Sequence, residues 1–273
     1  MPSIVKTIPT ADGGMALYSA SPAGAGPFAA IVVIQHAPGL DSFTQGMAGR
    51  LAEAGYCAVA PDLYHRQPPH ELDSKQHMEK LKDTEVIADV NAAVDYLRQE
   101  KTVAADRLAV IGFCMGGRVA YLMAAANRAF KAAVAYYGGN PRKAWGEGPA
   151  PFDRTREIAC PVLYHFGADD TNPSPEDMRA LDAEFTRHGK PHEFYSYPNA
   201  AHAFMNFTTP ERYREAADKT SWPRTLEFLK RHLKVNEENQ TETAEEAEGP
   251  ASGHAQPAAR FAAVQGSRQA LRR

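Results

Sequence analysis

The segment Gly112-Phe113-Cys114-Met115-Gly116-Gly117 carries the strongest chemical signal in this 273-residue chain. An apolar run at residues 107–112 predicts a strand before it, and the pattern at residues 115–126 predicts a helix after it. A cysteine at such a turn lies at a helix N-terminus, where the helix dipole and free N–H groups stabilise its thiolate, the reactive form. The small glycines let the turn close tightly. We therefore expect Cys114 to be a nucleophile.

A nucleophile on this kind of turn works with an acid and a histidine, which follow it in that order along the chain. The strand predicted to end at residue 166 is followed by Asp169 and Asp170, and the strand predicted to end at residue 197 is followed by His202. His202 would accept the proton of Cys114, and one carboxylate would fix the tautomer of His202. Chemistry alone leaves the choice between Asp169 and Asp170 open.

These residues lie on a regular alternation of strands and helices. Short apolar runs predict strands at residues 29–35, 56–60, 107–112, 132–137, 162–166 and 193–197. Helical periodicity predicts helices at residues 43–53, 76–99, 115–126, 175–188 and 210–233, with Pro175 and Pro210 in first turns. The alternation predicts an α/β fold, with a single doubly wound, mostly parallel sheet flanked by helices. Its ligand site is expected at the carboxyl ends of the strands.

Composition excludes several classes of protein. The 30 basic and 33 acidic residues give a net charge of -3, which argues against a nucleic-acid partner. No apolar run is long enough to span a membrane, and the N-terminus lacks a signal-peptide core. The three cysteines have no paired spacing, which fits a reducing cytoplasm. Cys57 and Cys160 are expected to be small buried residues.

The motifs also argue against a bound cofactor or metal. The glycines around Cys114 do not form a dinucleotide loop, because the cysteine stands where such a loop has its second glycine. The histidines form no HExxH pattern. We expect neither a cofactor nor a metal, and the sequence does not indicate the oligomeric state.

The C-terminal segment differs in composition from the rest. Residues 237–248 hold six glutamates and no lysine or arginine, and the residues after them are rich in Ala, Gly, Gln, Ser and Pro. Such a segment buries too little apolar surface to offset its ordering entropy. We expect one domain at residues 1–235 and a disordered tail at residues 236–273.

Four motifs in order resemble the dienelactone hydrolase (carboxymethylenebutenolidase) family of α/β-hydrolases. They are Ala60-Pro61-Asp62-Leu63-Tyr64, the glycine-flanked Cys114 turn, Gly167-x-x-Asp170 and His202-Ala203-Phe204. The resemblance covers about residues 25–233. It implies the α/β-hydrolase fold and a Cys-His-Asp triad. The family acid stands three residues after the glycine, which selects Asp170.

An oxyanion formed by attack on an ester needs fixed hydrogen-bond donors. One is expected to be the backbone N–H of Met115, directly after the nucleophile, and the other an N–H of the loop at residues 35–40. The resemblance assigns the second to Ala37. Pro38 has no N–H and cannot serve.

The chain departs from the family pattern at two positions. Members often carry Glu before the oxyanion residue, where this chain has His36; His36 could bond either Cys114 or the loop backbone. Members that act on dienelactone place an arginine where this chain has Asn206, which could offer a neutral donor and acceptor to a substrate. Arg66 is then the main candidate cation, and Tyr64 is a further candidate for the pocket wall.

The resemblance and the residues together predict a hydrolase that cleaves a small lactone or an activated enol or aryl ester through an acyl-cysteine. Two alternatives stay open. One is a thioesterase or general carboxylesterase with the same triad, and the other is a noncatalytic binding or redox-sensing protein that uses an activated Cys114. A panel of ester, lactone and thioester substrates would distinguish the thioesterase or carboxylesterase from the lactone hydrolase. Rapid thiol labelling of Cys114 without turnover of any ester would favour the noncatalytic protein.

Overall fold

A single eight-stranded sheet forms the centre of the molecule in the computed structural model, which describes residues 3–68 and 72–234. The strand order is β1-β2-β4-β3-β5-β6-β7-β8. The strands are β1 (Ser3–Thr10), β2 (Gly13–Ala20), β3 (Phe28–Ile34), β4 (Cys57–Pro61), β5 (Val103–Phe113), β6 (Phe130–Tyr136), β7 (Val162–Gly167) and β8 (His192–Tyr197). From β4 to β8 all neighbours pair in parallel. The predicted fold class is confirmed.

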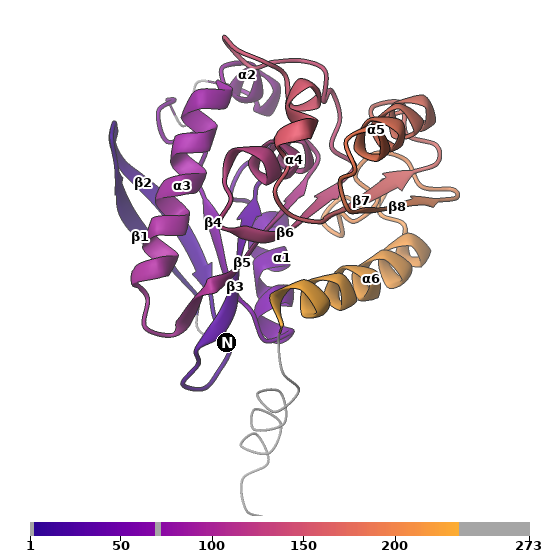
Figure 1. Cartoon of the computed structure of the whole chain (residues 1–273). Helices are drawn as coiled ribbons and strands as arrows, with labels where there is room; N and C mark the ends of the chain where they lie inside the picture. Colours follow the sequence, from indigo (N-terminus) through magenta and orange to yellow (C-terminus); the bar gives the residue numbers. More distant parts are fainter. Residues whose placement is uncertain (1–2, 69–71, 235–273) are drawn as a thin grey trace, which may run out of the picture.

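Helices cover both faces of the sheet (Figure 1). They are α1 (Ser42–Glu53), α2 (Ser74–Glu79), α3 (Asp83–Gln99), α4 (Met115–Ala126), η1 (Pro151–Glu157), α5 (Pro175–Arg187) and α6 (Glu215–Leu233). Apolar side chains of α3, α4 and α5 pack in one core cluster, and those of α1 and α6 pack in a second cluster on the other face. Burial of the sheet on both faces explains why β3 and β4 are apolar at every position.

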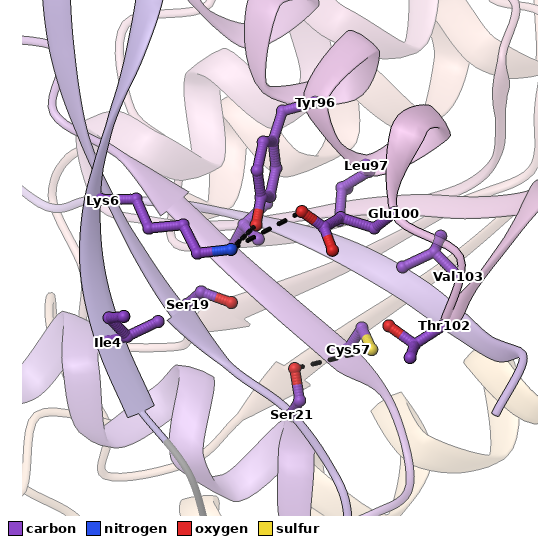
Figure 2. Close-up of a pocket in the computed structure, with 11 residues that line it drawn as sticks. Ile4, Lys6, Ser19, Ser21, Cys57, Tyr96, Leu97, Glu100, Thr102 and Val103 are labelled. Atoms are coloured by element: carbon purple, nitrogen blue, oxygen red, sulfur yellow. Dashed lines mark hydrogen bonds and ion pairs between the residues drawn. The ribbon is translucent and has the colours of Figure 1, made fainter. Parts of the chain in front are cut away.

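The sequence did not predict the antiparallel β1–β2 hairpin. Its strands carry few buried apolar residues, since β1 is an edge strand in which only Ile8 is buried. Figure 2 shows how the hairpin is attached to α3: the Lys6 ammonium donates to the Tyr96 hydroxyl at 2.6 Å and lies 3.6 Å from the Glu100 carboxylate. The small pocket between them also contains Cys57.

Two helix predictions need correction. The single helix expected at residues 76–99 is two helices, because Leu81 turns into the core and the carboxylate of Asp83 is held by Arg118. The last helix begins at Glu215 and not at Pro210, which lies in a turn. Pro175 does occupy the first turn of α5, capped by Ser174.

The fold brings the predicted site residues to one edge of the sheet. Cys114 follows β5, Asp170 follows β7 and His202 follows β8, all at carboxyl ends of parallel strands. Within the described ranges, every helix is too short or too polar to cross a membrane. The tail expected at residues 236–273 lies outside the described residues.

Candidate active site

Cys114 stands at the N-terminus of α4 in a backbone conformation that side chains rarely adopt, with φ 57° and ψ -122°. The turn is closed by direct contact between backbone segments. A Cβ atom on Gly112 would lie 1.9 Å from the carbonyl oxygen of Gly116, and one on Gly116 would lie 2.4 Å from that of Ile34. Only glycine fits at either position, so the two glycines are what allow Cys114 to project from the turn.

His202 and Asp170 meet Cys114 above the strand ends. The Nδ1 atom of His202 lies 3.0 Å from Oδ2 of Asp170, and the ring is close enough to the Cys114 thiol to lower its pKa. The Asp170 side chain is buried, and its other oxygen accepts from the backbone N–H of Asn172 at 2.9 Å. Asp169 is exposed. The geometry therefore selects Asp170 as the partner of His202, as the resemblance implies.

The electrostatics of this cluster favour a charged Cys114–His202 pair. Burial raises the pKa of the Cys114 thiol, but hydrogen bonds and the charge of His202 lower it by more than burial raises it. The net pKa therefore lies below that of an ordinary cysteine. Burial also opposes the charge on His202, yet its bonds to Asp170 and Cys114 raise its pKa to about 10. Between these two pKa values the sulfur is a thiolate and the ring is an imidazolium.

Two backbone N–H groups favour the thiolate of Cys114. Those of Met115 and Ala37 both lower the pKa of Cys114 by hydrogen bonding. Tyr64 fixes this arrangement, because its hydroxyl donates to the Ala37 carbonyl at 2.9 Å and lies 3.3 Å from the Met115 sulfur. Tyr64 itself stacks on His77, with ring centroids 4.7 Å apart. Tyr64 therefore positions the loop that carries Ala37.

His36, Arg66 and Asn206 are not brought to Cys114 by the structure. The Nε2 atom of His36 lies 2.8 Å from Asp41, which caps the N-terminus of α1. Asn206 accepts from the backbone N–H of Thr208 at 3.0 Å and so closes a local turn.

Arg66, expected as a cation of the pocket, does not line the cavity beside Cys114. Its guanidinium binds both oxygens of Asp89, at 2.7 and 2.8 Å, and also contacts Asp12. A buried carboxylate such as that of Asp89 needs a compensating cation, and this explains where Arg66 goes.

A cavity of about 530 Å³ opens beside Cys114 and His202. Its walls come from two segments, residues 78–81 and residues 139–146, together with the start of α4 and Asn172. Sequence reasoning missed most of the polar side chains here, which are Glu79, Arg118, Asn140, Lys143 and Asn172. Arg118 could have been found, because it stands four residues after Cys114 and so on the same helix face. Across the described ranges, acidic, histidine and cysteine side chains form no group of three that could hold a metal ion.

Comparisons with known proteins show which sequences this chain is similar to. The sequence profile of the dienelactone hydrolase family matches residues 15–233. A Methylorubrum extorquens protein named "Putative carboxymethylenebutenolidase" is 33% identical over 236 residues, which cover 82% of this chain and 79% of that protein. A Bradyrhizobium protein named "Probable 2-oxo-3-(5-oxofuran-2-ylidene)propanoate lactonase" is 33% identical over 226 residues, or 79% of this chain and 89% of that protein.

A solved structure shows the same similarity in three dimensions. The crystal structure named "Putative Dienelactone Hydrolase" from Klebsiella pneumoniae has a TM-score of 0.79 and 31% sequence identity to this chain. The match covers 84% of this chain and 98% of that one. The range matched by the family profile includes Cys114, Asp170 and His202.

The lowered pKa of Cys114 predicts selective alkylation. Near pH 7, iodoacetamide should label Cys114 rapidly, whereas Cys57 and Cys160 should not react, because burial raises the pKa of Cys57 and raises that of Cys160 to about 12. His202→Gln should raise the pKa of Cys114 and slow its labelling by ~10-fold near pH 7, with recovery at higher pH. Mass spectrometry of labelled peptides gives the rates. A wild-type rate that rises tenfold per pH unit up to the ordinary cysteine pKa would contradict the lowered value.

The two adjacent aspartates provide a matched test of the histidine's partner. Asp170→Asn would leave His202 in the wrong tautomer and should lower kcat on the best aryl ester by ~10⁴-fold. Asp169→Asn changes an exposed side chain and should alter kcat less than about threefold. Steady-state kinetics of both purified variants decide the matter. The reverse ranking would assign the role to Asp169.

Proposed function

Because the chain belongs to the dienelactone hydrolase family, we propose that it cleaves a small lactone or an activated enol or aryl ester through an acyl-cysteine on Cys114. Family membership makes the chain a hydrolase that acts on esters or lactones. The observation that carries the finer proposal is the hydrogen-bonded Cys114–His202–Asp170 cluster at the edge of a cavity of about 530 Å³. The lactonase name of the Bradyrhizobium relative supports a lactone substrate.

Acylation begins with the Cys114 thiolate. The sulfur attacks the carbonyl carbon, and the carbonyl oxygen becomes an oxyanion that accepts hydrogen bonds from the N–H groups of Ala37 and Met115. When the tetrahedral intermediate collapses, the carbon–oxygen bond of the ester breaks and the leaving oxygen takes the proton of His202. In a lactone this opens the ring, and the leaving oxygen stays attached to the acyl group.

Deacylation uses the same residues with the proton moving in reverse. Neutral His202 accepts a proton from water, and the resulting hydroxide attacks the thioester carbon. The oxyanion forms again between the same two N–H groups. The carbon–sulfur bond then breaks, which releases the carboxylic acid and restores the Cys114 thiolate beside protonated His202. Asp170 keeps the ring oriented through Nδ1 during both steps.

The leaving group decides which esters react. A thiolate is expelled from a tetrahedral intermediate more readily than an alkoxide, so an unactivated alkyl ester would mostly return to substrate. Enolates and phenolates are much weaker bases than alkoxides and leave readily. We therefore place enol lactones and aryl esters ahead of alkyl esters as substrates.

Charges around the cavity favour a neutral substrate. Arg118 is neutralised by a two-point ion pair with Asp83 at 2.6 and 2.9 Å. Apart from the Cys114–His202 pair, the remaining described charged side chains of the wall are Lys143, which is exposed, and Glu79, which is its opposite in sign. A buried carboxylate group on the substrate would need a cation that faces it.

Removal of the nucleophile should abolish turnover. Cys114→Ala is expected to lower kcat on the best ester by ~10⁴-fold or more, since the acyl intermediate cannot form. Cys57→Ala serves as the matched control, because Cys57 lies in the pocket of Figure 2 and should leave kcat unchanged. Stopped-flow measurement of aryl ester cleavage should show a burst in the wild type and in Cys57→Ala, but not in Cys114→Ala. A Cys114→Ala variant that keeps more than about a tenth of the activity would overturn the assignment.

A matched pair of substrates tests the charge of the site. A dienelactone methyl ester should be hydrolysed with a kcat/KM at least equal to that of the free acid. A preference for the free acid of more than ~10-fold, or about 1.4 kcal/mol, would show that a cation serves the substrate carboxylate. Lys143→Met would then identify that cation, because Lys143 lines the cavity.

A further inference from the structure

The wall of the cavity is fastened to the nucleophile helix by one buried side chain, Arg118. The residue is 1% exposed and lies one helical turn after Cys114, on the same face of α4. Its guanidinium binds both oxygens of Asp83 and donates to the Lys143 carbonyl. One face of the guanidinium is covered by the Trp145 ring, with its carbon 3.9 Å from the ring centroid.

Asp83 connects the same two wall segments from its own side. Its Oδ2 accepts from the backbone N–H of Trp145 at 2.9 Å, and its own N–H donates to the Trp145 carbonyl at 2.9 Å. Asp83 also begins α3, two residues after Leu81 of the first wall segment. Residues 78–81 and 139–146 are therefore both held at a fixed distance from Cys114 by the Arg118–Asp83 pair.

From this geometry we infer that the Arg118–Asp83–Trp145 cluster is a positioning device that sets which substrate sizes reach Cys114. The inference rests on the proposed function, since it concerns the same cavity. Arg118 supplies a two-point bond, a bond to the Lys143 carbonyl and a flat face against Trp145, which a lysine cannot reproduce. A fixed wall excludes bulky acyl groups, and a released wall admits them.

The chain contains a second cluster of the same composition that serves as a control. Arg50 on α1 binds both oxygens of Asp218 on α6, at 3.2 and 2.9 Å, and lies 4.4 Å from the Trp222 ring centroid. It packs with the helices on the other face of the sheet and does not line the Cys114 cavity. Replacement of this ion pair should leave substrate size selectivity unchanged.

The test replaces each ion pair with apolar residues of similar size, because removal of one partner alone would leave a buried charge. The variants are Arg118→Met/Asp83→Leu and, as control, Arg50→Met/Asp218→Leu. The readout is the ratio of kcat/KM for phenyl acetate to that for phenyl hexanoate. We expect the ratio to fall by ~10-fold or more in the first variant and to stay within about twofold in the second. Arg118→Lys keeps the charge that compensates Asp83, so its melting temperature should stay close to that of the wild type, whereas its ratio should fall as in the double variant.

A second measurement does not depend on turnover. Alkylation of Cys114 by iodoacetamide is compared with alkylation by the bulkier iodoacetanilide, and the relative rate of the bulky reagent should rise by ~10-fold in Arg118→Met/Asp83→Leu. If the wild type cleaves no ester or lactone, the proposed function fails while this ratio still tests the wall. Unchanged ratios in both assays, or equal losses of kcat on both esters, would overturn the inference.

Discussion

The site depends on the close approach of three backbone segments at the turn before α4. The carbonyl groups of Gly116 and Ile34 lie where side chains on Gly112 and Gly116 would have to be. Packing this tight holds Cys114 at a positive φ, a conformation that costs about 1–3 kcal/mol for a residue with a side chain. The buried faces of β5 and α4 supply the contacts that offset this cost. This conformation places the sulfur where the N–H groups of Met115 and Ala37 lower its pKa.

The charge state of the cluster follows from that placement. Burial alone would keep Cys114 a neutral thiol, as it does for Cys57 and Cys160, whose pKa values are raised. At Cys114 the same burial strengthens each hydrogen bond to the sulfur, and the bonds outweigh the desolvation. His36 lies against Asp41, and His202 is the histidine that lowers the pKa of Cys114.

The sequence predicted features that depend on neighbouring residues. The turn at Cys114, its flanking strand and helix, and the positions of Asp170 and His202 after strands can all be seen in local patterns. The β1–β2 hairpin gave no such pattern, because an exposed edge strand needs little apolar sequence. Arg66 was placed at the right strand end, but its contact with Asp89 on α3 is a long-range pairing that local patterns do not reveal. The split between α2 and α3 was missed for the same reason. Asp83, which begins α3, pairs with Arg118, 35 residues further along the chain, and local patterns do not reveal such a pairing.

Buried ion pairs such as Arg118–Asp83 contribute little net stability, because the desolvation of two charges offsets most of their attraction. An apolar pair of similar volume would fill the same space and stabilise the fold about as well. Stability therefore does not account for an arginine at residue 118. What an apolar pair could not do is bind the Lys143 carbonyl and the backbone N–H of Trp145 at fixed distances. Hydrogen bonds specify distance and direction, whereas apolar contacts tolerate shifts, so the arginine contributes the position of the wall relative to Cys114.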